Sequence, residues 1–543
     1  MNFVKGNGNR FGIFYLLIGL LLFSIFLAYV WRFTVDDAYI SFRYARHLAE
    51  GYGLVWNVGE LPVEGYTNFL WVVIVAFIHL LKLDPVFSTK IIGILALIGI
   101  VYLYWKIAND VLQNNRTFGL IVFCASLAFL LANPATAIHT VSGLETMFYT
   151  ACLLGVTYLA YRLTKSPEKR VCWLFAIVAL IGSLLRPEGI LVSIALFILV
   201  YILSLQKGKL GWDKKSFLVP FVLAYILPIT AYMVFRVYYF HELFPLPFYA
   251  KTVSHGSLFS GFYSLIDVSR FIAPFLIIIF IVIFQNIEAI WHEQKGQYAR
   301  FRTLLIITIA TILSANVVYL FSSLWMNYAQ RFYYPSFVII YIFSGISLGL
   351  LFNGVNGVWI NKTILKGYVK PVGCTLIVLL LLSANVTFIS DLSWEHKYGD
   401  RLPIAHVALG KALNDFSCHN LTFASIDAGA IPYFSEWRHI DMAGLNNKFI
   451  AKHGVATIDY VEKENPQLVI FISRDGGIPR HGGQQEPFIE FVQKRHYTKL
   501  PPVKWQENYY LVSFLDPNVK SFDEIKEAVQ KVSEASLRDG AIR

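Results

Sequence analysis

Residues 11–47 read FGIFYLLIGLLLFSIFLAYVWRFTVDDAYISFRYARH, an apolar run followed closely by two adjacent aspartates. The run 11–31 is long enough to cross a bilayer. It is also longer than the apolar part of a usual signal peptide and has no small-residue cleavage site. We therefore expect a retained transmembrane helix, with Asp36 and Asp37 at its water edge, where a charge costs little. The two carboxylates can serve there as a base, or they can simply cap the next segment.

The composition of the chain places it among polytopic membrane proteins. Of its 543 residues, 56% are hydrophobic and only 15% are charged, which is too apolar for a soluble globule of this length. We expect about eleven transmembrane helices. The predicted spans are 11–31, 86–107, 117–133, 144–163, 170–185, 189–206, 216–238, 268–287, 302–322, 332–352 and 371–390.

One apolar run, 67–83, is ambiguous because its apolar core is short and contains His79. Basic residues cluster near the N-terminus, at 162–170, at 207–215, at 295–302 and at 362–370. Cytoplasmic loops carry such an excess of Lys and Arg. All of these clusters lie on the same side of the membrane only if 67–83 does not cross it. We therefore predict an interfacial helix at 67–83, a cytoplasmic N-terminus and an exported C-terminal part.

The same assignment determines which loops face outward. The external loops are expected to be 32–85, 134–143, 185–188, 239–267 and 323–331, together with everything after 391. The unusual polar residues lie almost entirely in these segments. The active face is therefore predicted to be external.

The character of the sequence changes near residue 391, so we divide the chain into a membrane domain, 1–390, and a soluble extracytoplasmic domain, 391–543. Short buried strands are predicted at 421–427, 467–473 and 509–515. Helices are predicted between them, and alternating strands and helices are typical of a small α/β domain with a mainly parallel sheet. A final amphipathic helix after Ser521 is expected to pack on the surface of this domain.

Charge and cysteine content exclude several function classes. The net charge is +11, but the bases lie between apolar runs, so nucleic-acid binding is not expected. The five cysteines show no CxxC or metal-ligand spacing, which argues against disulfides and zinc–thiolate sites. The Asp36–Asp37 pair could hold a divalent cation. However, no second acidic cluster lies nearby in sequence, so we expect no required metal or other cofactor.

Several motifs together resemble a known family. They are DDAYISFRYARHLAEGYGLVWN (36–57), VEGYTNFLW (63–71), SGLET (142–146), LLRPEG (184–189), FRVYYFHELFPLPFYAK (235–251), QRFYYP (330–335) and DAGAIPYFSEWRHIDMAGLN (427–446). In this combination the chain is similar to bacterial members of the GT-C glycosyltransferase superfamily, in particular the arabinofuranosyltransferase-like branch. The resemblance implies a transferase of the bacterial inner membrane. Such an enzyme moves a sugar from a polyprenyl-phosphate donor to a cell-envelope acceptor on the outer face, with a catalytic Asp in the first external loop.

An inverting transfer needs a base for the acceptor hydroxyl and cations for the departing phosphate. The family motif matches both Asp36 and Asp37; we favour Asp36 as base, with Asp37 orienting the substrate or the loop. The candidate phosphate ligands are Arg43, His139, Arg186, Lys251 and Arg331, and the candidate sugar or acceptor ligands are Glu64, Tyr66, Asn68, Glu145, Glu188 and Tyr249. Each also has a structural explanation: a loop salt bridge for Arg43, a hydrogen-bonded loop residue for His139, a local ion pair for Arg186 with Glu188, snorkelling for Lys251, and interface anchoring for Arg331 and the aromatic residues.

The expected partners are a polyprenyl-phosphate-linked sugar, membrane lipids and an envelope glycan, lipid or protein as acceptor. Two other functions remain open. A flippase of lipid-linked sugars would suit eleven spans, but transporters usually show two related halves with polar residues at the midplane, and no such internal symmetry is visible. A non-catalytic envelope assembly factor would use the exported domain as its working part.

Overall fold

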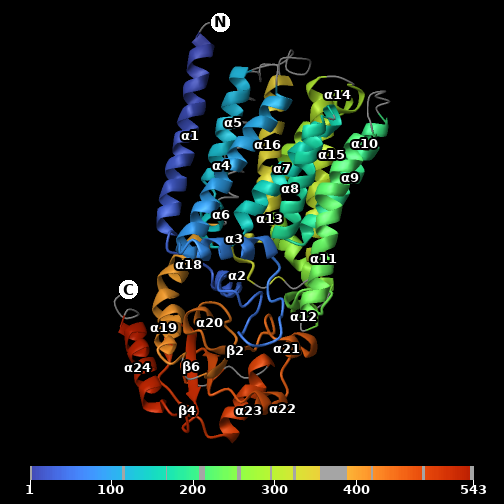
Figure 1. Ribbon diagram of the computed structural model, residues 1–543. Coiled ribbons are helices and arrows are strands. Elements are labelled where there is room, and N and C mark those ends of the chain that lie inside the picture. The colour runs from blue at the N-terminus through green and yellow to red at the C-terminus, as the bar shows by residue number, and fades with distance from the viewer. Residues whose placement is uncertain are drawn as a thin grey trace.

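The computed structural model describes residues 3–112, 116–166, 168–206, 214–253, 258–293, 296–321, 324, 326–354, 388–417, 420–477, 479 and 483–538. In this part of the chain a bundle of long helices stands on a smaller domain that contains a β-sheet (Figure 1). α1 begins at the end of the bundle remote from the sheet, and α24, the last described helix, lies beside the sheet (Figure 1).

The bundle follows the apolar runs of the sequence. Each predicted span up to 332–352 coincides with a helix or with a continuous helical segment, whereas the last, 371–390, lies almost wholly outside the described residues. The long helices are α1 (Phe3–Tyr29), α4 (Pro85–Val111), α5 (Arg116–Leu131), α7 (Thr146–Lys165), α8 (Lys169–Leu185), α9 (Glu188–Gln206), α10, η1 and α11 in succession (Lys214–Phe221, Val222–Ile226 and Leu227–Phe240), α13 (Leu258–Gln285), α15 (Gln297–Asn316) and α16 (Tyr334–Gly354). The shorter elements η2 (Val317–Phe321), η3 (Tyr328–Gln330) and α14 (Ile287–His292) join them.

Among the described residues, four helical segments are long and apolar enough to cross a bilayer, or five if one bent pair counts as a single span. That pair is Phe123–Leu131 with Pro134–Val141, which meet at 61°. The second member is α6 (Pro134–Val141), so most of the segment predicted as a loop, 134–143, is helical. The helix forms because Pro134 suits a first helical turn and the Asn133 side chain accepts the Ala135 N–H at 2.9 Å.

Two short helices lie across the end of the bundle that faces the sheet: α2 (Asp36–Ala49) and α3 (Phe69–Leu80) (Figure 1). At 12 residues, α3 is too short to span a bilayer of ordinary thickness. The structure therefore has a helix within 67–83, and its place at a membrane interface stays a prediction. The two helices pack against each other and form the platform on which the candidate site is built.

The C-terminal part contains a mixed sheet, with strand order β2-β1-β3-β6-β4 and β5 paired to β6. β1 pairs in parallel with β2 and β3, but β6 is antiparallel to β3, β4 and β5. The prediction of a mainly parallel sheet was therefore wrong. β5 and β6 in particular are antiparallel because a short turn joins them, in which Asn508 adopts a positive φ of 58° and the chain reverses.

The sequence prediction found β1 (Thr422–Ser425), β3 (Leu468–Ser473) and β6 (Tyr509–Leu515) but missed the shorter strands β2 (Arg438–Asp441), β4 (Thr498–Lys499) and β5 (Val503–Gln506). Helices cover both faces of the sheet, with one apolar core beneath α19 and α24 and another beneath α21, α22 and α23. The helices of this part are α18 (Ile389–Arg401), η4 (Pro403–Val407), α19 (Ala408–Asn414), α20 (Ala430–Ser435), α21 (Lys448–His453), α22 (Ile458–Glu464), η6 (Gly483–Gln485), α23 (Glu486–Lys494) and α24 (Phe522–Arg538).

Candidate active site between the bundle and the sheet

Asp36 is the first residue of α2 and is bound from the C-terminal part of the chain. Its carboxylate accepts the N–H groups of Gly429 at 3.0 Å and Ala430 at 2.8 Å. Its own N–H donates to the Tyr398 hydroxyl at 2.9 Å. Burial raises the pKa of Asp36 to about 6, with the negative charge of Asp427 adding to the rise and the positive charge of His406 opposing it. Because each carboxylate oxygen of Asp36 accepts one of these backbone N–H groups, both oxygens already have hydrogen-bond donors from the protein.

Asp37 has a different environment from its neighbour, because successive residues of a helix point about 100° apart. Its side chain is 30% exposed, and one carboxylate oxygen lies 3.6 Å from Arg331 Nη1. Of the two aspartates, Asp37 is the one that pairs with a predicted phosphate ligand.

Arg331 links Asp37 to a buried ionic cluster at the start of α7. Arg331 Nη2 lies 3.7 Å from Glu145, and Glu145 also accepts a hydrogen bond from Asn68 at 2.8 Å. Arg186 lies 3.9 Å from the same glutamate and 2.7 Å from Glu188. With Asp37, six residues predicted from sequence thus meet in one network.

Lys251 belongs to α12 (Leu246–Val253) and lies near the same network. Its ammonium lies 5.5 Å above the ring of Phe332 and makes no ion pair with any described residue. Burial lowers the pKa of Lys251 to about 8; the charge of Asp37 opposes this shift, and the charges of Arg331 and Arg186 add to it. Lys251 therefore lies close enough to interact electrostatically with Asp37, Arg331 and Arg186.

Several donors around this network have no hydrogen-bond partner in the described part of the chain. Arg331 Nε and Arg186 Nη1 are both buried and unpaired. The Thr146, Tyr149 and Tyr333 hydroxyls share this state. Buried polar groups are normally satisfied, so a concentration of unpaired donors marks a place where a polar or anionic ligand can bind.

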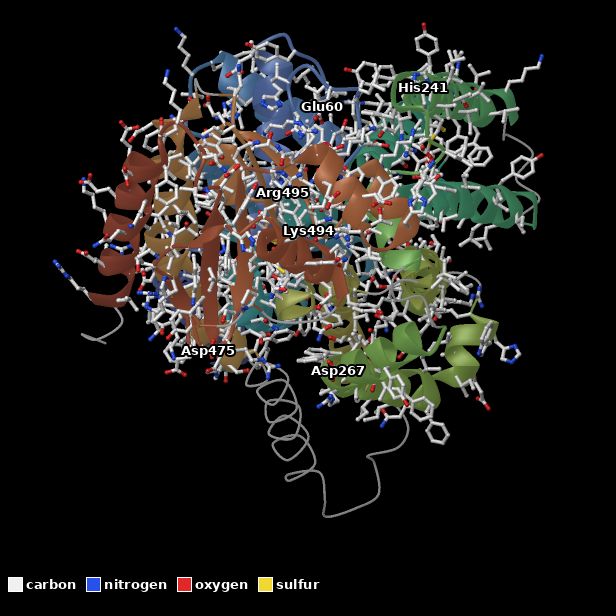
Figure 2. The ribbon with its side chains drawn as sticks, turned by 90° about the horizontal axis from the view of Figure 1, so that it is seen from below. Glu60, His241, Asp267, Asp475, Lys494 and Arg495 are labelled. Atoms are coloured by element: carbon white, nitrogen blue, oxygen red, sulfur yellow. The ribbon has the colours of Figure 1, made fainter. Side chains whose placement is uncertain are left out.

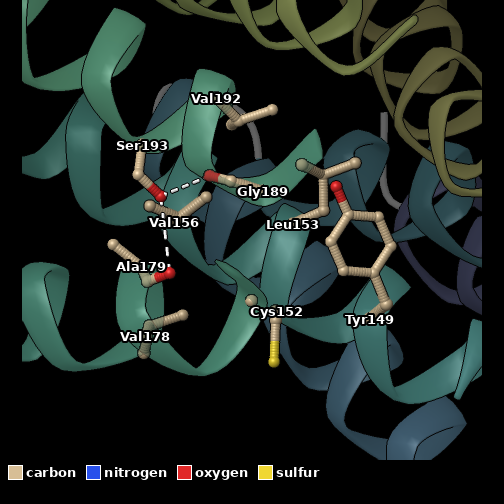
Figure 3. Close-up of a pocket in the computed structure, with 10 residues that line it drawn as sticks. Tyr149, Cys152, Leu153, Val156, Val178, Ala179, Gly189, Val192 and Ser193 are labelled. Carbon is tan, nitrogen blue, oxygen red and sulfur yellow. Dashed lines mark hydrogen bonds between the residues drawn. The ribbon is translucent and has the colours of Figure 1, made fainter. Parts of the chain in front are cut away.

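A small pocket between α7, α8 and α9 lies next to these donors (Figure 3). Tyr149 lines it, and the ring of Tyr149 also stacks with the Arg186 guanidinium, 5.4 Å from centroid to carbon. Most of the lining is apolar; Ser193 directs its hydroxyl to the carbonyls of Gly189 and Ala179 (Figure 3). The ionic network thus borders an apolar recess of the bundle.

Two predicted phosphate ligands lie outside the network. Arg43 is buried and donates to the carbonyls of Trp56, Pro432 and Trp437, so it binds the first loop and α20 rather than an aspartate. His139 Nε2 is 2.9 Å from the Ala329 carbonyl oxygen. This contact positions η3, the element just before Arg331.

The predicted sugar ligands also divide. Asn68, Glu145 and Glu188 belong to the network, whereas Glu64 is paired with Arg236 of α11 at 2.9 Å. Burial raises the pKa of Glu64, and Arg236 opposes this rise. Tyr66 is buried against Tyr44 and Phe240, and Tyr249 contacts Lys452 of α21 through its ring, at 5.8 Å.

Sequence reasoning missed several residues that contact segments distant in the sequence. Tyr398, His406, Asp427 and Tyr509 all lie in the C-terminal part near Asp36. Asp427 heads one of the motifs quoted above, which was an available signal. Arg236, within a predicted span, was another, because an ionisable residue at membrane depth usually has a role.

No three His, Cys, Asp or Glu side chains converge as a possible metal site among the residues that the structure describes. The aspartate pair in particular divides its carboxylates between backbone N–H groups and an arginine. Metal dependence stays a prediction from sequence.

Comparison with known proteins gives a fold. A family model described as a domain of unknown function (DUF8728) matches residues 394–530. No curated protein matches the sequence. Among solved structures, the chain is similar to ArnT from Cupriavidus metallidurans bound to undecaprenyl phosphate, with 13% identity and a TM-score of 0.54 over 93% of this chain and 98% of that one.

The apo form of the same ArnT also aligns, with 13% identity and a TM-score of 0.49 over 93% and 97% of the two chains. The first alignment extends over the bundle and the sheet domain together. The chain therefore has an ArnT-like fold, which confirms the predicted combination of a helical bundle and a C-terminal domain that contains a sheet.

Proposed function

We propose that this protein is an integral-membrane glycosyltransferase that moves a sugar from a polyprenyl-phosphate donor to a cell-envelope acceptor. One observation carries the proposal: a partly exposed carboxylate, Asp37, faces Arg331 and Lys251 where buried arginine donors lack partners. The ArnT-like fold supports it, since the solved ArnT structure contains undecaprenyl phosphate.

The chemistry is an inverting displacement. Asp37 accepts the proton of an acceptor hydroxyl, and the hydroxyl oxygen forms a bond to the anomeric carbon. The bond between that carbon and the phosphate oxygen breaks, so the lipid phosphate leaves with the electron pair. Arg331, Arg186 and Lys251 stabilise the charge that develops on it.

This assignment exchanges the roles expected from sequence for the two aspartates. Asp36 holds two backbone N–H groups, and its carboxylate is directed at the C-terminal part of the chain. Asp37 lies beside the cations that would bind the donor phosphate. A general base must reach the proton that it removes, so we assign the base to Asp37 and a positioning role to Asp36.

The finer features of the proposal come from the sequence resemblance and topology. They are an arabinofuranose-like sugar, a reaction on the external face, a cytoplasmic N-terminus in the bacterial inner membrane, and a division of the chain into 1–390 and 391–543. Mass spectrometry of envelope glycans with and without the gene would identify the missing sugar and its attachment point.

The direct test is sugar transfer by purified protein in lipid nanodiscs, with polyprenyl-phosphate sugars as donors. Asp37→Asn is expected to lower kcat by about 10²–10⁴-fold, the usual contribution of a general base, with the protein still folded. The control is Asp459→Asn, which changes an exposed aspartate of α22. Full turnover by Asp37→Asn would refute the assignment, and lipid scrambling without acceptor would favour a flippase.

A further inference from the structure

α2 packs against α20, which lies beside it in Figure 1. Beyond Asp36, Arg46 donates to the Tyr433 carbonyl at 2.9 Å and pairs with Glu436 at 2.9 Å. Gly429 comes so close to Asp36 that a Cβ at this position would overlap the Asp36 backbone oxygen and carboxylate. The position of α2, the helix that begins with Asp36 and Asp37, therefore depends on the position of residues 427–430.

Residues 427–430 are held by a second group of side chains that the proposed reaction does not use. The Asp427 carboxylate is 2.9 Å from His406 Nε2 and accepts the Tyr509 hydroxyl at 2.9 and 3.0 Å. The Asp427 carbonyl accepts the Ser425 hydroxyl at 2.9 Å. The ring of Trp505 packs edge-on against both His406 and Tyr509.

These three partners of Asp427 come from three separate elements: η4, β1 and β6. Burial opposes protonation of His406, but the hydrogen bond and charge of Asp427, with the charge of Asp36, outweigh it and raise the pKa of His406. A charged hydrogen bond of this kind is stronger than a neutral one. Asp427 is thus fixed by η4 and by two strands of the sheet.

We propose that the His406–Asp427–Tyr509 group is a positioning site through which the C-terminal domain sets the orientation of Asp37. The group holds residues 427–430, whose Gly429 and Ala430 N–H groups fix the Asp36 carboxylate. Because Asp36 and Asp37 are consecutive in one helix, fixing the first determines where the second points. This inference rests on the proposed function and gives the C-terminal domain a part in it.

The test uses Asp427→Asn in the full-length chain, which preserves the size of the side chain but removes its charge. We expect kcat for sugar transfer to fall by about 10- to 100-fold, because small misplacements of a reacting group are costly. KM for the lipid donor is expected to stay unchanged, since the cations lie on other elements. Tyr509→Phe should give a smaller loss in the same direction. The matched control is Tyr497→Phe, which removes a hydroxyl bonded to the Pro466 carbonyl in the same domain.

Two further measurements separate positioning from a general loss of folding. Hydrogen exchange at Gly429 and Ala430 should accelerate in Asp427→Asn while exchange in β3 stays slow. The double variant Asp36→Asn/Asp427→Asn should be no worse than Asp36→Asn alone, because both act through one contact.

The inference is overturned if Asp427→Asn accelerates exchange without changing kcat, if the two variants are additive, or if exchange in β3 also accelerates. Asp37→Asn is measured in parallel. Full activity of that variant would refute the proposed function itself, whatever the result at Asp427.

Discussion

Adjacent residues can have unrelated environments when they begin a helix between two domains. Asp36 points to backbone N–H groups of the C-terminal part, and Asp37 points to Arg331. The carboxylate that accepts two backbone N–H groups is poorly placed to take a proton from a substrate. The carboxylate beside cations still reaches solvent, because it is 30% exposed.

At the residue scale, Lys251 gives a pH dependence. With a pKa of about 8 in the free protein, it is charged below pH 8 and loses its charge above it. We expect kcat/KM for the lipid donor to fall as the pH rises through about 8, because donor phosphate loses a cation. Lys251→Arg should remove this alkaline limb, since arginine stays protonated. An unchanged limb in Lys251→Arg would assign it to another group.

A second prediction at this scale concerns the buried Glu64–Arg236 pair, whose side chains are 4% and 7% exposed. Glu64→Met and Arg236→Met each leave a buried charge without its partner, a change that destabilises by about 3–5 kcal/mol. The double variant should be closer to wild type. Thermal unfolding in detergent measures all three. Single variants as stable as wild type would contradict the pairing.

At the element scale, the close approach of α2 and the loop before α20 depends on a residue without a side chain. Gly429→Ala would place a methyl group against the Asp36 backbone and carboxylate. We expect about 10- to 100-fold slower transfer from a displaced α2, with both domains folded. Gly477→Ala is the control, because its Cβ would meet Asp475 at an ordinary 3.4 Å. Equal activity of the two variants would show that α2 tolerates the displacement.

Elements also explain the uneven success of the sequence predictions. Long apolar helices were located well, because their signal is local and extends over many residues. β4 was missed because two residues carry no periodicity, and β2 and β5 were missed because charged residues interrupt their four-residue patterns, RHID and VKWQ. The helix α6 was taken for a loop because small residues and one proline interrupt the apolar pattern, although Asn133 and Pro134 together are a helix-start signal.

At the scale of the whole molecule, the candidate site lies at one end of the bundle and the basic residues that follow α7 lie at the other. α7 starts at the ionic network and has 20 residues, so it extends about 30 Å away from the candidate site. The basic residues at its far end belong to a cluster that we predict to be cytoplasmic. The candidate site and the sheet domain lie together at the other end.

Cysteine labelling in a cysteine-free background tests this arrangement. Arg495→Cys lies on the sheet domain, which faces the viewer in Figure 2, and Lys169→Cys lies at the start of α8. Both positions are exposed. We expect a membrane-impermeant thiol reagent to label Arg495→Cys in intact cells and Lys169→Cys only after permeabilisation. Labelling of both positions in intact cells would contradict the predicted orientation.

The sequence by itself determined the class of protein, the course of the chain through the bundle and the residue types of the site, because apolar length and charge are local properties. It could not show that Arg186, Lys251 and Arg331 meet, or that Arg43 does not join them. Nor could it separate Asp36 from Asp37. The distinction comes from a contact between residues 393 positions apart, Gly429 and Asp36. Only the packing of the C-terminal part on the bundle determines which carboxylate is held by backbone N–H groups and which lies beside Arg331.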